Sequence, residues 1–274
     1  MLAALSSAAV IALAPVSVTV TSGPVTATLT GVGAAGEHAL TAAGDIRVTI
    51  ARGGAVAFNA PLRPCRFGCA PDDPSGARFA EISAGDLDGD GEPEVLIDRS
   101  DGFTPCCTLE TAILRRDPAT GAYRELDRHW GAGYRVIDLD RDGRAELVTS
   151  DLRFYERFAP RLVGFQMPVK ILALRGPGLV DVTRAHRGTV HRHARSLARL
   201  LHETDGIVDG RRPGNRVQAR AALRPQLAAY AAEQRLMGRR AVGDRRVARE
   251  VAGGRVSAGF ERLLMRFLRL TGYR

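Results

Sequence analysis

A short acidic segment occurs twice in this chain of 274 residues, and it constrains the fold more than any other feature. DLDGDGEPEVLID at 86–98 aligns with DLDRDGRAELVTSD at 138–151, 52 residues further along the chain. In both copies carboxylates stand at positions one, three, five and nine, and glycine stands at position six. An apolar stretch typical of a strand follows each copy, so the repeat predicts two strand–loop–strand units.

The acidic residues of the two copies favour metal binding. We refer to residues 86–94 as loop one and to residues 138–146 as loop two. Four carboxylates within nine residues repel one another, and oxygen ligands suit a hard divalent cation such as Ca²⁺. The glycine at position six permits a turn that points the carbonyl of position seven inward. We therefore predict two calcium sites. The predicted side-chain ligands are Asp86, Asp88, Asp90 and Glu94, and Asp138, Asp140, Asp142 and Glu146, and the predicted backbone ligands are Glu92 and Arg144.

Two other interpretations of the loops were weighed. An EF-hand takes its bidentate carboxylate from position twelve, where this chain has Ile97 and Thr149. Strand-like residues follow both loops in place of a second helix, so the EF-hand and dockerin interpretations fail. The remaining alternative is a pair of metal-free Asp-Gly turns between hairpin strands. The same four-carboxylate spacing in two copies favours metal.

The D-x-D-x-D-G-x-x-[DE] pattern, with strands on either side, resembles the calcium loops of FG-GAP or VCBS-type repeats, as in integrin α-subunits. This resemblance covers residues 70–150 and implies calcium held between outer strands of propeller blades. Glu94 and Glu146 stand where Asp is commoner, and two repeats are too few to close a propeller. As a whole the chain also resembles exported actinobacterial proteins with these repeats.

The hydrophobic pattern changes once along the chain. Residues 18–180 contain short alternating runs rich in Val, Thr and Ile, which indicate antiparallel strands. In residues 181–274, Ala, Leu and Arg recur at three- and four-residue spacings, in HRHARSLARLLHE, PQLAAYAAEQRLMGRR and FERLLMRFLRLTGY, which indicates amphipathic helices. We place Pro225 in the first turn of the second helix. The predicted fold class is α+β, with a β domain, partly propeller-like or a sandwich, and a small helical domain after it.

The N-terminus and the cysteines indicate export. Residues 2–14 form an apolar run of small residues, so we expect 1–17 to be a signal peptide and the mature chain to be secreted or extracytoplasmic, without a transmembrane segment. Four cysteines fit an oxidising compartment and predict two disulfides among Cys65, Cys69, Cys106 and Cys107. Bridges from the first pair to the second are favoured, because a bridge between adjacent cysteines is strained. A tetrathiolate zinc site is the alternative.

Basic residues are concentrated in the C-terminal segment. Residues 181–274 hold 21 arginines and 8 acidic residues, whereas the first 180 residues hold 18 basic and 22 acidic residues. Lys170 is the sole lysine against 38 arginines, a bias that indicates a GC-rich genome and weakens the case for nucleic acid as a partner. Arginines on the polar face of such helices usually face water. An anion-binding role for this segment is kept as an alternative.

Other residues give weaker signals. His186, His191, His193 and His202 lie close in sequence, but their spacing does not place them on one helical face, so we expect surface histidines. Trp130 is expected in the core. No common hydrolase or nucleotide-binding motif appears.

These observations predict an exported calcium-binding repeat protein with a structural or recognition role at the cell surface. The expected partner is a cell-surface protein or a glycan, and no catalytic group is identified. The alternative is a secreted hydrolase whose active site the sequence does not reveal.

Overall fold

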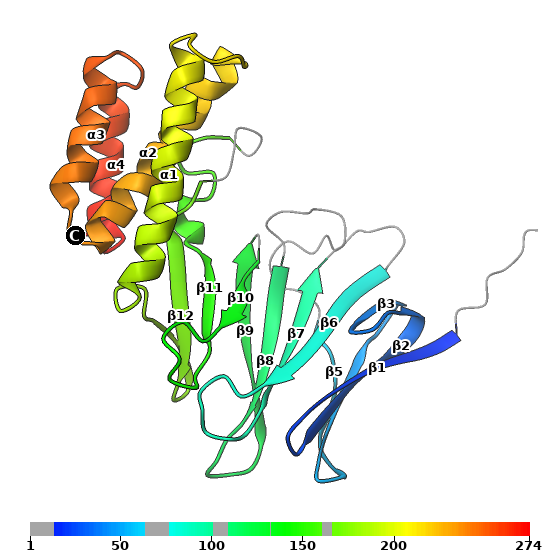
Figure 1. Ribbon diagram of the computed structural model, residues 1–274. Helices are drawn as coiled ribbons and strands as arrows, with labels where there is room; N and C mark the ends of the chain where they lie inside the picture. The colour runs from blue at the N-terminus through cyan, green and yellow to red at the C-terminus, as the bar shows by residue number, and fades with distance from the viewer. Residues whose placement is uncertain (1–13, 64–76, 101–108, 132, 161–165) are drawn as a thin grey trace, which may run out of the picture. The chain divides into compact units, whose positions relative to one another are not determined.

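Strands occupy the first two thirds of the chain and helices the last third (Figure 1). The computed structural model describes residues 14–63, 77–100, 109–131, 133–160 and 166–274. These residues form two compact units, 1–132 and 133–274. The order of strands and helices confirms the predicted α+β class. Strands give way to helices near the expected boundary at 180/181, whereas the units divide at 132/133, so loop one and loop two belong to different units.

The predicted disulfides and most of the predicted signal peptide lie outside the described residues. All four cysteines fall in the ranges 64–76 and 101–108, and most of the expected signal peptide falls in residues 1–13. Residues 14–17, the last part of that expected peptide, lie in the first strand.

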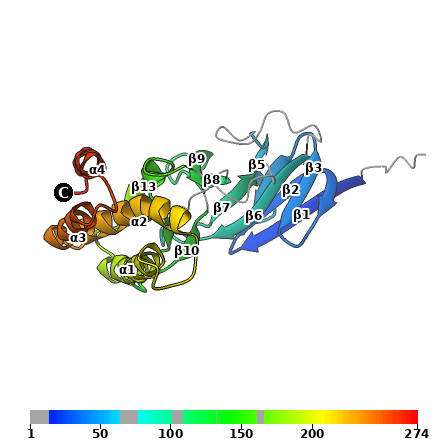
Figure 2. The ribbon, with the colours of Figure 1, turned by 90° about the horizontal axis from the view of Figure 1, so that it is seen from above.

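The first unit contains one antiparallel sheet of nine strands in the order β5-β4-β2-β3-β6-β7-β8-β9, with β1 also paired to β2. Figure 2 shows β1, β2, β3, β5 and β6 of this sheet. The strands are β1 (Ala14–Ser22), β2 (Val25–Ala35), β3 (Ala39–Ala43), β4 (Arg47–Arg52), β5 (Ala55–Pro61), β6 (Ala77–Gly85), β7 (Glu94–Ser100), β8 (Leu109–Arg116) and β9 (Tyr123–Gly131).

Alternation of apolar and polar residues builds the core of this sheet. Successive side chains of a strand point to opposite faces. In β2, Val25, Ala27 and Leu29 are buried at every second position, and in β4 Val48 and Ile50 follow the same rule. These side chains belong to one apolar cluster that continues into β6, β7 and β8, so the strands on both sides of loop one are anchored in the core.

The expectation for Trp130 is confirmed. Its side chain is 1% exposed, and its indole N–H donates to the hydroxyl of Thr111 at 2.8 Å.

The second unit combines a four-stranded antiparallel sheet, in the order β10-β11-β12-β13, with four α-helices. Val190 of α1 packs with Val148, Val169 and Ile171 of the sheet. The elements are β10 (Arg135–Ile137), β11 (Glu146–Ser150), the 3-10 helix η1 (Leu152–Phe154), β12 (Val169–Arg175), β13 (Gly178–Asp181), α1 (Arg187–Val208), α2 (Arg216–Leu236), α3 (Arg240–Ala252) and α4 (Ala258–Leu270).

The helices correct two expectations. The prediction that Pro225 lies in a first turn is wrong, because α2 begins at Arg216 and Pro225 lies inside it. Asn215 starts the helix early, since its side chain accepts the N–H groups of Val217 and Gln218 at 3.0 and 3.1 Å. The helix α3 is a separate element that the periodicity did not indicate.

A buried glutamate joins α1 and α2 to the sheet. The side chain of Glu233 in α2 is fully buried, and it accepts the backbone N–H of Val169 in β12 at 2.9 Å. The same oxygen is hydrogen-bonded to Nδ1 of His193 in α1. Burial raises the pKa of Glu233, and the contact with His193 opposes that shift. This arrangement fixes the position of α1 on the strand beside loop two.

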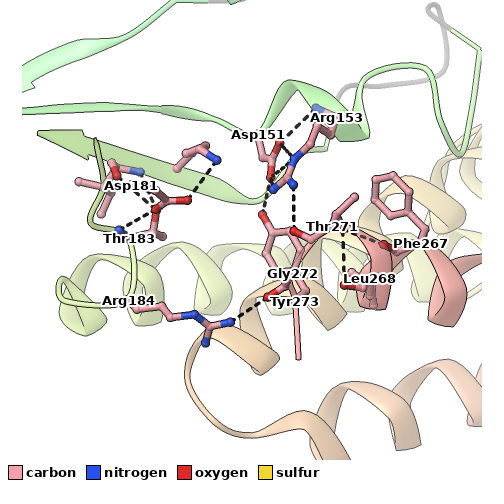
Figure 3. A network of polar contacts seen from close by, with 12 residues as sticks. Asp151, Arg153, Asp181, Thr183, Arg184, Phe267, Leu268, Thr271, Gly272 and Tyr273 are labelled. Atoms are coloured by element: carbon pink, nitrogen blue, oxygen red, sulfur yellow. Dashed lines mark hydrogen bonds and ion pairs between the residues drawn. The ribbon is translucent and has the colours of Figure 1, made fainter. Parts of the chain in front are cut away.

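The C-terminal residues 271–273 are tied to Asp151, Arg153 and Arg184 by polar contacts (Figure 3). The hydroxyl of Tyr273 donates to Oδ2 of Asp151 at 2.7 Å, and Arg153 donates to the carbonyl of Thr271 at 2.8 Å. Burial acts to raise the pKa of Asp151, but hydrogen bonds from Arg153 and Tyr273 outweigh it and lower that pKa. The Tyr273 ring packs edge-on against Phe154, with ring centroids 5.5 Å apart.

Most arginines of residues 181–274 face water, as the helical pattern suggests. The exceptions are Arg235, Arg246 and Arg255, which are buried or half-buried. Arg246 is ion-paired with Asp205 at 2.7 Å, and Arg255 with Glu250 at 2.6 Å. In the described part of the chain, the helices lack the combination of length and apolar character needed to cross a bilayer.

We expect Tyr273→Phe to lower the free energy of unfolding of the second unit by about 1–2 kcal/mol, because it removes a hydrogen bond to a buried carboxylate. Tyr230→Phe is a matched control, since Tyr230 packs against the same apolar core and its hydroxyl has no hydrogen bond among the described residues. Urea unfolding followed by circular dichroism measures both. Equal losses in the two variants would contradict a specific role for the Tyr273 hydroxyl.

Candidate metal centre

Both acidic loops are closed by the same strand register. Strands β6 and β7 pair up to Gly85 opposite Glu94, and strands β10 and β11 pair up to Ile137 opposite Glu146. In each case the residue before position one faces position nine. The loops therefore share their starting geometry although they belong to different units.

The carboxylate at position one organises the turn in both loops. Asp86 accepts the N–H of Gly89 at 2.8 Å through one oxygen and that of Gly91 at 2.9 Å through the other. Asp138 accepts the N–H groups of positions four and six in the same way, at 2.7 and 3.1 Å, and also that of position five at 3.2 Å. A single side chain thus folds the backbone around itself.

Positions five and nine repeat this correspondence. Asp90 and Asp142 each accept the N–H of position seven, at 2.8 and 2.9 Å. Glu94 and Glu146 each accept the N–H of position two at 2.9 Å. The two loops therefore have nearly the same set of backbone hydrogen bonds to their carboxylates.

Positions four and six adopt left-handed backbone conformations in both loops. Gly91 and Gly143 at position six both have φ of 84°, and a Cβ atom there would have no neighbour within 4 Å. The requirement for glycine is therefore conformational. At position four loop one has Gly89, whereas loop two has Arg141 with φ of 64°, an uncommon conformation for a side chain of this size.

The turns bring three aspartates together in each loop. Carboxylate oxygens of Asp86, Asp88 and Asp90 lie within 4.8 Å of one another, and so do those of Asp138, Asp140 and Asp142. Two oxygens on opposite sides of a calcium ion are about 4.6–5.2 Å apart, given Ca–O distances of about 2.3–2.6 Å. Each acidic group could therefore hold a metal ion.

The predicted residues at positions seven and nine are placed differently. Glu94 does not join the first group of aspartates, whereas Glu146 lies with Asp140 and His186 in a further group. The side chain of Glu92 turns to Arg52, with Nε and Oε1 2.9 Å apart. The backbone ligands proposed at Glu92 and Arg144 stay predictions.

Charge in loop one is only partly neutralised by the protein. Asp88 faces Nη2 of Arg115 at 3.4 Å, and its other oxygen is buried without a hydrogen-bond partner in the described structure. Burial and the charge of Asp90 raise the pKa of Asp88. Burial also raises the pKa of Glu94 to about 7, against the hydrogen bond from Leu87. A bound cation would relieve this unfavourable burial of charge.

A histidine that the sequence pattern does not indicate lies beside loop two. The expectation that His186 is a surface residue is wrong, because its side chain is only 10% exposed. Its Nε2 lies 3.7 Å from Oε1 of Glu146. No pattern in the sequence links the two residues, since the contact arises only from the folding of β12 and β13.

A cavity in the second unit bears on the alternative of a hydrolase. It has a volume of about 450 Å³, and its lining includes Arg153, Lys170, Asp181, Thr183 and Tyr273. Asp181 is engaged by Lys170 at 3.1 Å and by the Thr183 hydroxyl at 2.6 Å. Serine and histidine are absent from the residues that line this cavity. The cavity therefore gives the hydrolase alternative no specific support.

No protein-family model matches the chain, and the comparisons with curated proteins and with solved structures found no match. The chemistry assigned to the loops therefore rests on their own residues and geometry.

In metal-free solution we expect the free energy of unfolding of the first unit to fall as the pH rises from about 4.5 to about 7. Folded Glu94, with a pKa of about 7, keeps its proton through this range, whereas unfolded Glu94, with an ordinary value of 4.5, loses it. Glu94→Gln removes the titrating group while its amide oxygen can still accept the N–H of Leu87. Urea unfolding at several pH values with chelator present compares the two proteins, and parallel pH profiles would refute the assignment.

Proposed function

We propose that this protein is an exported calcium-binding repeat protein with a structural or recognition role at the cell surface. The observation that carries the proposal is the correspondence between the two loops. They share strand register, hydrogen bonds to positions one, five and nine, and left-handed conformations at positions four and six. In both loops this arrangement gathers three aspartates whose negative charge a bound cation would balance.

The donor atoms favour calcium among the common cations. The three grouped side chains of loop one, Asp86, Asp88 and Asp90, offer oxygen atoms alone. Ca²⁺ accepts six to eight oxygens in flexible geometry, whereas Mg²⁺ requires a near-ideal octahedron and retains several waters. A loop that supplies side-chain oxygens, and the carbonyl proposed at position seven, is better suited to the larger ion.

The resemblance to FG-GAP and VCBS-type repeats supports the same proposal. Strands β6 and β7 and strands β10 and β11 stand on either side of the loops, as the strand–loop–strand pattern requires. A metal ion at each loop would hold the ends of two paired strands together. We infer that calcium stabilises each hairpin and so supports a surface that contacts a cell-surface protein or a glycan.

Export is proposed from the sequence. The apolar run at residues 2–14 and the four cysteines fit secretion into an oxidising compartment, where millimolar calcium sites are common among extracellular modules. Weak sites of this kind suit an environment in which the ion is abundant.

The test uses Asp90→Asn and Asp142→Asn. Asparagine keeps the oxygen that accepts the N–H of position seven, so each substitution removes one negative charge while leaving that hydrogen bond possible. We expect the wild type to bind two Ca²⁺ ions with Kd of about 10⁻⁴–10⁻³ M. At 10 mM Ca²⁺ this stabilises each unit by about 1.4–2.7 kcal/mol. Each variant should lose one binding event in a calorimetric titration and the stabilisation of its own unit.

Asp117→Asn is the matched control. Asp117 also accepts backbone N–H groups in a turn, from Ala119 at 2.9 Å and Thr120 at 3.2 Å, but it belongs to neither acidic group. This variant should bind calcium as the wild type does. Identical melting temperatures of the wild type in calcium and in excess chelator would sink the proposed function.

A further inference from the structure

Loop two carries a second set of metal-ligating side chains that loop one lacks. Ligand atoms of Asp140, Glu146 and His186 all lie within 4.8 Å of one another. The set mixes two carboxylates with an imidazole nitrogen. Glu146 is 2% exposed and His186 is 10% exposed at the side chain, so two of the three members are almost fully buried.

No hydrogen bond among the described residues accounts for the position of the His186 imidazole. His186 precedes α1 as its N-cap residue, but its side chain makes no capping hydrogen bond. Within the described residues it takes part in no side-chain hydrogen bond, and its distance of 3.7 Å to Glu146 is too long for one. The nitrogen is instead aimed at the acidic group.

The spacing suits two ligands of one ion. Neighbouring ligands about 2.0–2.2 Å from a zinc ion are about 2.8–3.6 Å apart in octahedral or tetrahedral arrangements. The separation of 3.7 Å between Nε2 and Oε1 is close to that range. The other oxygen of Glu146 accepts the N–H of Leu139 at 2.9 Å, which orients the carboxylate as metal-bound carboxylates commonly are.

The aspartate at position three faces a different side chain in loop one. There the aspartate at position three, Asp88, faces the guanidinium of Arg115, which supplies positive charge and cannot bind a metal. In loop two the corresponding Asp140 faces His186, which can donate a lone pair. The two loops therefore share their turn but differ in the chemistry that faces it.

We propose that Asp140, Glu146 and His186 bind a divalent transition-metal ion, with Zn²⁺ as the probe. Mixed nitrogen and oxygen ligands suit such ions, whereas calcium is bound by oxygen. Three protein ligands leave at least one coordination position for water. This inference deepens the proposed function, because it names the ion class that loop two prefers. Asp140 belongs to both groups of loop two, so zinc and calcium compete there.

The experiment is a calorimetric titration of ZnCl₂ into the metal-free protein, with His186→Gln as the test variant. Loss of a direct ligand should weaken zinc binding at least about 100-fold, which is the upper end of the loss seen when only a supporting residue is removed. His191→Gln is the control, because His191 lies in the first turns of α1 and belongs to none of the metal-ligating groups. It should bind zinc like the wild type.

Asp140→Asn provides a second variant at an exposed position, so loss of binding there does not arise from a disrupted core. Co²⁺ substitution supplies an independent signature. The His186-dependent ion should give visible d–d bands without the near-ultraviolet charge-transfer band of thiolate ligands, which separates it from binding at cysteines.

The outcomes separate this inference from the calcium proposal. Zinc binding that is equal in wild type and His186→Gln overturns the inference, even if calcium occupies both loops. Zinc binding that depends on His186 and Asp140 supports it, even if calcium fails to bind loop one. Under the inference, Asp90→Asn leaves zinc binding unchanged, and a loss of zinc in that variant would also overturn it.

Discussion

The structure of both loops depends on one carboxylate that collects backbone N–H groups. Asp86 and Asp138 each fold the following residues around their side chain, and this brings the next two aspartates beside it. The same contacts that form the turn therefore concentrate negative charge. At loop one the protein offsets this charge only in part, with Arg115. In such a turn the position-one carboxylate accepts the backbone N–H groups, but the negative charge of the three aspartates is not fully balanced.

The last residue of each loop is also the first residue of a strand and is buried in the protein. Glu94 and Glu146 are the first residues of β7 and β11, and both are almost fully buried. Burial at this position explains why the pKa of Glu94 is raised and why a metal bound nearby would act on the hairpin itself. In the second unit, the buried contact between Glu233 and Val169 holds the helices on the same sheet and so keeps the start of α1 near loop two.

Local sequence patterns predicted the features that neighbouring residues determine, namely the turns of the two loops and the change from strands to helices. The nine-residue spacing, the glycine at position six and the change from alternating to helical periodicity all gave correct elements. Contacts set by distant segments could not be read in this way. His186 lies 40 residues after Glu146, and it returns to loop two because Asp181 in β13 pairs with Leu172, beside the partner of Glu146 in β12. Pro225 was misplaced because the capping by Asn215 was overlooked.

The two loops lie in different units, and each unit has its own apolar core. Under the proposed function, an ion at each loop acts on the hairpin of its own unit. With one metal-responsive hairpin in each unit, such a chain can hold no ion, an ion in either loop, or an ion in both.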